Sequence, residues 1–237
     1  MKISVIIPAH NEEKVIGDSL RAILAQDYSD YEVIVVDNNS ADKTAEVARS
    51  FNVKVVHEPN KGTMWACERG RKEATGDIIV RMDADCIPET KWLSRGALFF
   101  NNPKVVGASG PYDYYDAEAF FRYLSLYIQK IIYGFVSYII QQPFHFGGIM
   151  IGGNSFIRAS TLEAIGGFNT AITFYGDDTE IAKRLAKKGY VVFSSKLVLK
   201  TSWRRFKQEG VVALQFKYLY HFFKHLFKRV ETKRPPR

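Results

Sequence analysis

The sequence has few cysteines and no signal-like apolar run at its N-terminus. Cys67 and Cys86 are the only cysteines among its 237 residues. Two cysteines are too few for a disulfide framework, and their spacing is not that of a metal site, so we expect a reducing compartment and two unreactive thiols. The apolar run at residues 3–7 is too short for the core of a signal peptide and is typical of a buried first strand.

An uninterrupted apolar segment long enough to cross a membrane is also missing. The longest uncharged stretch, residues 131–157, contains Gln141, Gln142, Pro143 and several glycines. Moving the window back to residue 119 brings in Arg122 and Lys130. Because a spanning helix needs about 20 mostly apolar residues in a row, we predict no transmembrane helix. A helix lying on a membrane surface stays compatible with the pattern.

The excess of positive charge is confined to one end of the chain. The composition, 46% hydrophobic and 24% charged, excludes disordered and collagen-like classes and predicts a globular protein with a full core. The net charge of +8 arises from 33 Lys and Arg against 25 Asp and Glu. Residues 1–202 carry 23 of each sign, whereas residues 203–237 carry 10 basic and 2 acidic side chains. This distribution predicts a neutral domain with a cationic, aromatic tail, which favours an anionic membrane surface over nucleic acid.

The first half alternates short β-branched runs with helical patterns. The strands are expected at residues 3–7, 32–36, 53–57 and 78–82. Such alternation predicts an α/β fold with a mainly parallel sheet flanked by helices. Ligands of these sheets bind beyond the carboxyl ends of the strands, so the segments that follow the strands are candidates for the site. They are residues 8–12, 37–40, 58–62 and 83–85.

The second half is less regular. It predicts an aromatic helix at residues 118–140, a glycine-rich loop at 147–153, a strand at 154–158, a short helix from Ser160, a helix opened by residues 176–180 and ended by Gly189, and a final strand at 191–194. The glycines of the loop either mark turns or let the backbone approach a ligand closely.

Asp83-Ala84-Asp85 follows the fourth predicted strand. Alternation along an extended chain sends Asp83 and Asp85 to one side, where they can hold a divalent cation completed by phosphate oxygens and water. Taken alone, this short motif more often marks a solvated loop. It gains weight because Asp37 is placed to accept hydrogen bonds from a nucleobase or ribose, and because Lys61 supplies a cation for phosphates.

Asp177, Asp178 and Glu180 crowd the start of a predicted helix. Acidic residues in a first turn interact favourably with the helix dipole, which explains one or two of them. Clustering also raises the pKa of a carboxyl group, which suits a general base that takes a proton from an alcohol. The spacing leaves both interpretations open.

Taken in order, these motifs resemble those of the family 2 glycosyltransferases, which have the GT-A fold of nucleotide-diphospho-sugar transferases. Residues 3–13 look like the opening strand and loop, residues 35–40 like the base-recognition segment, and Asp83-Ala84-Asp85 is similar to the metal-binding DxD motif. Gly152-Gly153-Asn154, residues 165–168 and Gly176-Asp177-Asp178 resemble the acceptor-side signature. The resemblance covers roughly residues 2–194.

The resemblance implies an inverting, metal-dependent, hexosyltransferase-like enzyme. It implies that the nucleotide sugar is bound by Pro8, Ala9, Asn11, Glu12, Asp37, Lys61, Asp83, Ala84 and Asp85. It further implies that Asp83 and Asp85 hold Mg or Mn and that Asp178 is the catalytic base. The acceptor side is expected to include Gly152, Gly153, Asn154 and Asp177. An acceptor phosphate, which is already ionised, would need that base much less.

Three positions depart from the family pattern. The helix after Gly62 reads Ala66-Cys67-Glu68 where an Ala-Arg-Asn run is frequent, and Asp177-Asp178 replaces the usual Glu-Asp pair. Thr201-Ser202-Trp203 follows the last predicted strand, where many relatives have a histidine that binds the metal. A metal site of two carboxylates, or contact of Arg204 and Arg205 with the diphosphate, would follow.

Two aromatic helices are expected in the second half. From Val212 to Val230, apolar residues recur at steps of three and four, with Lys217, Lys224 and Lys228 opposite them. This C-terminal amphipathic helix is typical of a membrane interface, although packing on the domain or in a dimer gives the same pattern. The helix at residues 118–140 is interpreted as a covering or interfacial helix near the acceptor entrance, with core packing as the alternative.

The predicted organisation is a catalytic domain at residues 1–202, with a nucleotide-sugar half at 1–112 and an acceptor half at 113–202, followed by a basic aromatic helix and tail at 203–237. The donor is expected to be a UDP- or GDP-sugar and the acceptor a lipid-linked or membrane-associated glycan or a polyprenyl phosphate. The expected location is cytoplasmic, peripheral on the inner face of the cell membrane.

Two other functions share some of these sequence features. A sugar nucleotidyltransferase shares the general fold, but it should carry a glycine-rich, basic N-terminal loop, and residues 8–13 are acidic instead. A nucleic-acid-binding module would suit the net charge and interleaved aromatics, yet no RNA- or DNA-reading motif is present.

Overall fold

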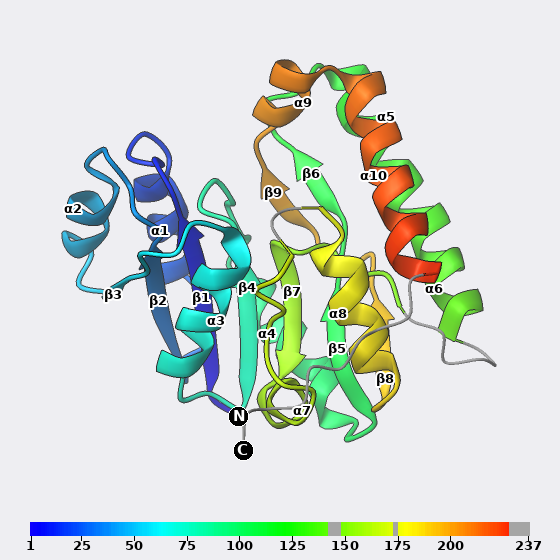
Figure 1. Cartoon of the computed structure of the whole chain (residues 1–237), viewed down its shortest axis with the longest axis horizontal. Helices are drawn as coiled ribbons and strands as arrows, with labels where there is room; N and C mark the ends of the chain where they lie inside the picture. The colour runs from blue at the N-terminus through cyan, green and yellow to red at the C-terminus, as the bar shows by residue number, and fades with distance from the viewer. Residues whose placement is uncertain (142–147, 173–174, 228–237) are drawn as a thin grey trace.

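The central element of the computed structural model is a seven-stranded sheet with strand order β3-β2-β1-β4-β7-β5-β8 (Figure 1). The structure describes residues 1–141, 148–172 and 175–227. Antiparallel pairing occurs where β7 meets β4 and β5, and the other neighbours pair in parallel. The predicted mainly parallel sheet is therefore confirmed. Its strands are β1 (Ile3–Ala9), β2 (Tyr31–Asp37), β3 (Lys54–His57), β4 (Ile78–Met82), β5 (Val105–Ser109), β7 (Asn154–Arg158) and β8 (Tyr190–Phe193).

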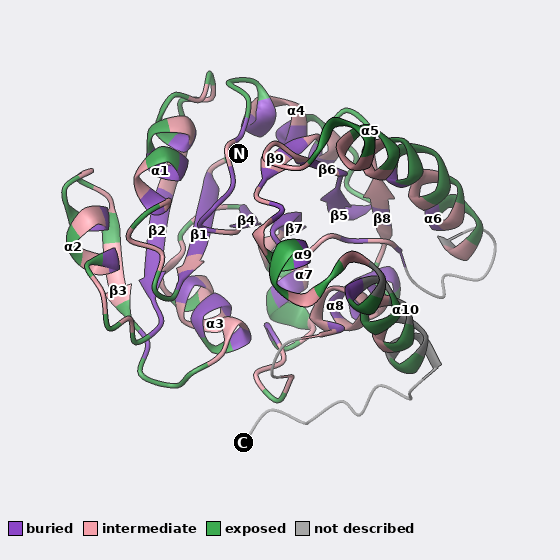
Figure 2. Cartoon of the chain, turned by 90° about the horizontal axis from the view of Figure 1, so that it is seen from above, coloured by how far each residue is buried: buried purple, intermediate pink, exposed green. Residues whose placement is uncertain are grey.

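Helices cover both faces of this sheet (Figure 2). The helices of the described residues are α1 (Ile16–Leu24), α2 (Thr44–Arg49), α3 (Thr63–Glu73), α4 (Trp92–Leu98), η1 (Phe99–Asn101), α5 (Ala119–Ile128), η2 (Gln129–Tyr133), α6 (Gly134–Gln141), α7 (Ala159–Ala164), α8 (Asp177–Ala186), α9 (Arg204–Glu209) and α10 (Val211–Phe227). A second sheet pairs β6 (Tyr112–Tyr114) with β9 (Leu199–Thr201) in parallel beyond the upper edge of the main sheet.

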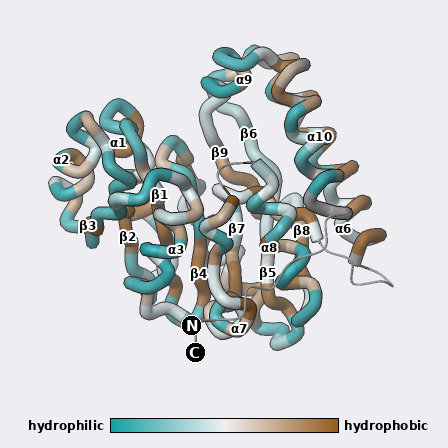
Figure 3. The backbone as a smooth tube through the Cα atoms, in the orientation of Figure 1, coloured by the Kyte–Doolittle hydropathy of each residue, from teal (hydrophilic) through white to brown (hydrophobic). Residues whose placement is uncertain are grey.

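Alternation along the strands produces two cores. Val5 and Ile7 of β1 pack toward α1, whereas Ile6 packs on the opposite face with residues of α3 and α8. Figure 3 shows the central strands as largely hydrophobic, as expected of a sheet buried on both sides. Two covered faces leave the carboxyl edge of the sheet as the place where polar side chains can gather.

Several short elements were absent from the sequence interpretation. The strands expected at residues 154–158 and 191–194 form as β7 and β8, but β8 is not the final strand, because β9 follows it. β6 and β9 have three residues each, too few for a recognisable alternation, and β5 contains Gly107. Helices α4 and α9 were also missed. Gly147 of the predicted glycine-rich loop lies outside the described residues.

Among the described residues, one helix has the length and composition of a membrane span, and the prediction of no transmembrane helix stays a prediction. α5, η2 and α6 run on from one another, and the 22 residues Ala119–Ile140 are apolar enough to cross a membrane on those two criteria. The charges of Arg122 and Lys130 are too few to exclude the segment. Figure 1 shows this helix at one flank of the domain.

In the helix formed by α5, η2 and α6, the usual distribution of a soluble protein is reversed, with polar side chains buried and apolar side chains exposed. Its buried residues include Gln129, whose side chain bonds to the backbone of Tyr112 through both amide atoms, and Ser137. Arg122 pairs with buried Asp113. Besides Ala119 and Lys130, its exposed residues are large and apolar: Phe120, Tyr123, Leu124, Tyr127, Ile128, Ile131, Ile132, Phe135, Tyr138 and Ile139. This exposed set is called the outer apolar face below.

The predicted C-terminal helix forms as α10. Leu214 is fully buried, and the ring of Tyr218 contacts those of Tyr175 and Phe206. Phe216 and Tyr220 are exposed, as is Lys217. The amphipathic stripe to Val230 stays a prediction, because it runs beyond the described residues.

Two helical glycines give a matched test of packing. A Cβ at Gly96 of α4 would lie 2.1 Å from the Phe156 ring, whereas a Cβ at Gly134 of α6 would meet nothing within 4 Å. We expect Gly96→Ala to lower the free energy of unfolding by about 1–3 kcal/mol. Gly134→Ala should leave it unchanged or raise it by up to about 1 kcal/mol. Urea unfolding followed by circular dichroism measures both, and equal effects would contradict this account of the core.

Candidate functional site

The first group of polar side chains lies at the carboxyl end of β2. Asp37 is buried, its Oδ1 accepts a hydrogen bond from the Ser40 backbone, and His57 Nδ1 lies 3.4 Å from Oδ2. Asn38 donates to the carbonyls of Glu58 and Asn60 and accepts from the Gly62 backbone. Asn38 therefore fixes the loop after β3 beside Asp37, as expected for adjacent parallel strands.

The loop after β1 lies next to this group. Pro8 and Ala9 end the strand, and the Asn11 side chain accepts a hydrogen bond from the Ala41 backbone. Glu12 is anchored through its backbone to Thr44 and turns its carboxylate toward the C-terminal half of the chain. The structure thus brings together most of the predicted nucleotide-binding segment. Lys61 is exposed in the loop after β3.

Asp83, Ala84 and Asp85 directly follow β4, as predicted. Asp83 is partly exposed and accepts a hydrogen bond from the Tyr112 hydroxyl at 3.1 Å. Asp85 is buried and accepts one from the Thr201 hydroxyl at 3.2 Å. Burial and the nearby Asp83 carboxylate raise the pKa of Asp85 to about 6, and the Arg204 guanidinium opposes this rise. The ionised form of Asp85 is therefore unfavourable in this position unless a cation lies beside it.

Arg204, at the start of α9, supplies a cation to this carboxylate. Its Nε lies 3.0 Å from Asp85 Oδ2, and its two terminal nitrogens form a bidentate pair with Glu12 at 2.5–2.6 Å. Residues 192 positions apart in sequence are joined in this way. Arg205 does not share this position, since its guanidinium reaches the Tyr218 hydroxyl on α10.

Arg81 is a site residue that sequence reasoning missed. It lies on β4, where all five residues are buried, and its Nη1 donates to Asp177 Oδ2 at 2.5 Å. Its Nη2 lies 3.9 Å from Asp83 Oδ1. The available signal was a single cation inside an otherwise apolar strand, two residues before Asp83. Arg81 brings the second acidic motif to the carboxyl end of β4.

The glycine pair packs against these charges. A Cβ on Gly152 would lie 2.7 Å from Arg81 Nη1, and one on Gly153 would lie 2.2 Å from the Asp83 carboxylate. Contacts this short are not available to a side chain. Gly152 and Gly153 form the turn between Ile151 and Asn154, whose backbones are hydrogen-bonded at 2.9 Å, so the turn interpretation of this glycine pair is confirmed and the approach to a ligand stays a prediction.

Asp177, Asp178 and Glu180 have different surroundings. Glu180 pairs with Arg184 at 2.8 Å within α8, which is a structural contact. Asp178 accepts a hydrogen bond from the Thr179 backbone, and burial together with the neighbouring Asp177 raises the pKa of Asp178 to about 7. A carboxyl group with this pKa can accept a proton near neutral pH.

Asn154 does not reach the acceptor side as expected. It is fully buried, its Oδ1 accepts from Trp92 Nε1, and its Nδ2 donates to the carbonyls of Gly110 and Leu197. These bonds use its amide within the protein. Its surroundings give Asn154 a structural role in joining the ends of β5 and β7 to the loop before β9.

The acidic residues can contribute only part of a metal's coordination. Across the described residues, no group of three or more His, Cys, Asp or Glu is arranged to hold a metal ion. Asp83 and Asp85 provide hard carboxylate oxygens, which suit Mg or Mn when phosphate oxygens and water complete the shell. Thr201 belongs to the segment that lacks the metal-binding histidine of the family pattern, and its hydroxyl donates a hydrogen bond to Asp85.

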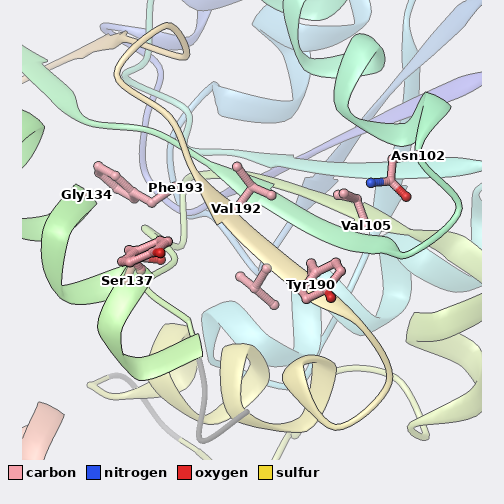
Figure 4. A pocket seen from close by; sticks show the side chains of 9 residues that line it. Asn102, Val105, Gly134, Ser137, Tyr190, Val192 and Phe193 are labelled. Atoms are coloured by element: carbon pink, nitrogen blue, oxygen red, sulfur yellow. The ribbon is translucent and has the colours of Figure 1, made fainter. Parts of the chain in front are cut away.

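A separate cavity of about 390 Å³ lies between α6 and the edge strand β8 (Figure 4). Gly134 and Ser137 of α6 face Val192 and Phe193 of β8 across it. None of the predicted site residues lines this cavity, so it is not part of the polar site described above.

Comparisons with known proteins point to one family. The model of the family described as glycosyl transferase family 2 matches residues 4–166. The chain is 31% identical over 199 residues to the glycosyltransferase AglE of Haloferax volcanii, a match that covers 79% of this chain and 62% of the relative. It is 26% identical over 225 residues to the dolichyl N-acetyl-alpha-D-glucosaminyl phosphate 3-beta-D-2,3-diacetamido-2,3-dideoxy-beta-D-glucuronosyltransferase of Methanococcus voltae, covering 86% of this chain and 67% of the relative.

The fold matches solved structures of the same kind. The mannosyltransferase PcManGT from Pyrobaculum calidifontis, in complex with GDP-Man and Mn2+, superposes with a TM-score of 0.67 at 23% identity, covering 95% of this chain and 68% of that one. The chain spans about three fifths of the length of the first curated relatives, with 62% and 60% of their residues covered. The predicted GT-A fold is confirmed, and the chain belongs to glycosyl transferase family 2.

Proposed function

We propose that the protein is an inverting glycosyltransferase that moves a sugar from a nucleoside diphosphate sugar to an acceptor hydroxyl. The observation that carries this proposal is the contact of Arg81 with Asp177, which places the start of α8 against the Asp83 end of β4. A donor-binding strand end and a candidate base then face one reaction space. Neither of the other functions weighed from the sequence is favoured by a structural feature.

The donor is assigned to the carboxyl edge of β1, β2 and β4. Asp37 retains acceptor capacity for a nucleobase, while Pro8, Ala9, Asn11, Glu12, Lys61 and Ala84 border the nucleotide. Either a UDP- or a GDP-sugar suits this chemistry. Asp83 and Asp85 would hold Mg or Mn, and when bound there the cation would supply positive charge to the diphosphate leaving group. Arg204 adjoins the same carboxylates and can contact the diphosphate.

Asp178 is assigned as the general base. A carboxylate oxygen of Asp178 takes the proton of the acceptor hydroxyl, and the oxygen attacks the anomeric carbon from the side opposite the diphosphate. The bond from that carbon to the diphosphate oxygen breaks, and its electron pair leaves with the nucleoside diphosphate. One such displacement inverts the configuration. Asp177, Gly152 and Gly153 border the acceptor side of this space.

The acceptor is proposed to be lipid-linked and the protein to lie on a membrane. The Methanococcus voltae relative is named for a dolichyl phosphate-linked substrate. The outer apolar face presents ten large apolar side chains to solvent, and Phe216, Lys217 and Tyr220 of α10 are exposed as well. Apolar and tyrosine side chains beside cations suit an anionic membrane interface. Both cysteines are free and buried, which fits a cytoplasmic location on the inner face.

Asp178→Asn should abolish transfer to a hydroxyl acceptor, by at least about 100-fold in kcat, while donor binding is kept. In the unmodified enzyme, kcat should rise with pH through about 7, since the base must be deprotonated. A raised pKa in the folded state means that Asp178 contributes stability at low pH that is lost as pH rises through 7. The Asn variant should therefore remain folded. Initial rates across pH 5.5–8.5, about this pKa, test the assignment, and undiminished turnover of the variant would contradict it.

Nucleotide and metal should stabilise the protein together. At about 100 times its Kd, UDP or GDP with MnCl2 should raise the Tm by about 5–10 °C. Asp85→Ala should remove the metal-dependent part of this shift. Asp18→Asn, an exposed carboxylate of α1 that pairs with Arg21, should leave it unchanged. Differential scanning fluorimetry measures the shift, and a protein that no nucleotide stabilises would overturn the donor assignment.

Membrane binding should depend on the outer apolar face. Leu124→Asp should weaken co-sedimentation with vesicles containing phosphatidylglycerol by about tenfold, because it places a charge in the apolar contact. Leu24→Asp on α1 is the matched control, since the two leucines are 43% and 42% exposed. Equal binding of the two variants would refute this surface as the site of membrane contact.

A further inference from the structure

We propose that Arg81 binds a hydroxyl of the transferred sugar and so helps to select the donor. This inference rests on the proposed function and adds a specificity-determining residue to it. Arg81 was not among the predicted site residues, and none of the family motifs noted in the sequence includes it. The guanidinium of Arg81 has unused hydrogen-bond donors, packs against two glycines and lies between the two acidic motifs.

Its contacts with protein leave most of the guanidinium unused. A guanidinium carries five N–H donors. Among the described residues, the hydrogen bond of the Arg81 side chain is that from Nη1 to Asp177, and Nε is buried without a partner. Nη2 lies 3.9 Å from Asp83, which is an ion-pair distance and not a hydrogen bond. Unused donors on a buried cation are costly unless a ligand completes them.

Arg184 shows what a purely structural arginine of this protein looks like. It is as buried as Arg81, at 8% against 9% exposure, and also pairs with a carboxylate of α8. Arg184 in addition donates to the carbonyls of Ile165 and Gly167 through Nη1. Its Nε, like that of Arg81, is buried without a hydrogen-bond partner, but the main chain accepts from the guanidinium of Arg184, whereas that of Arg81 has no such carbonyl among the described residues.

The glycine pair packs directly on Arg81 and Asp83. Gly152 approaches the guanidinium so closely that a Cβ would lie 2.7–3.0 Å from three of its atoms, and Gly153 approaches the Asp83 carboxylate in the same way. The glycine backbone therefore holds the two charged groups in place, and no side chain of these two residues lies beside them.

The position of Arg81 identifies the part of the donor that it meets. In an in-line displacement the anomeric carbon lies between the leaving diphosphate and the attacking oxygen. In the proposed function the diphosphate lies at Asp83 and Asp85, and the attacking oxygen at Asp178. Arg81 contacts Asp83 on one side and the neighbour of Asp178 on the other. The ligand between them is the sugar ring, and its hydroxyl oxygens are acceptors for N–H donors.

The test compares nucleotides with and without the sugar. The affinities of UDP and UDP-N-acetylglucosamine, and of GDP and GDP-mannose, are measured with MnCl2 by isothermal titration calorimetry. In Arg81→Met, the nucleotide sugar that the unmodified protein binds should bind about tenfold or more weakly, since a charge-assisted hydrogen bond is lost. The matching nucleoside diphosphate should bind within about twofold of the unmodified protein.

Two further variants separate contact from structure. Arg81→Lys keeps the charge beside Asp177 but loses the fork of donors, so it should also lose sugar-dependent affinity and serves if Arg81→Met does not fold. Arg184→Lys should change neither affinity. Equal weakening of nucleotide and nucleotide sugar, or full sugar affinity in both Arg81 variants, would overturn the inference. If the unmodified protein binds UDP or GDP but neither of the nucleotide sugars, the proposed function itself fails.

Discussion

The buried ion pair between Arg81 and Asp177 is the interaction on which the arrangement of the site depends. A charged arginine on an interior strand is tolerated only with a partner, because an isolated charge in a buried position is strongly unfavourable. The partner comes from the start of α8, 96 residues later in the chain. Satisfying Arg81 therefore fixes where α8 begins, and with it the position of Asp178. The glycines at 152 and 153 are a consequence, since no side chain fits beside these charges.

A second cation, Arg204, balances the other end of the site. Asp85 and Glu12 come from different strand ends, and Arg204 contacts both of their carboxylates. Two acidic side chains at one sheet edge repel each other unless a positive charge lies between them. The start of α9 is held at the carboxyl edge of the main sheet by this contact. The site is thus an alternation of charges contributed by β1, β4, α8 and α9.

The helix formed by α5, η2 and α6 follows a different constraint. Its polar residues Gln129 and Arg122 are fixed by the backbone of Tyr112 and the carboxylate of Asp113, next to the small sheet. These bonds determine which face of the helix meets the domain. The apolar residues are then left on the outside, where a soluble protein normally places polar ones. The same helix therefore contributes to the framework of the site and presents an apolar surface.

The sequence by itself determined the α/β order of elements, the central strands β1, β2, β4 and β7, and the acidic residues that follow β4 and open α8. These features are encoded over a few neighbouring residues, as periodicity, turn residues and motif order. It did not reveal Arg81, the buried role of Asn154, the short strands β6 and β9, or the outward face of the long aromatic helix. Each of those depends on which segments become neighbours in the fold: Arg81 and Asp177 are 96 residues apart in the chain, Asn154 and Trp92 are 62 apart, and Gln129 and Tyr112 are 17 apart. Only tertiary packing decides such neighbours, because the energy of a buried charge or amide is set by the partner that folding brings to it.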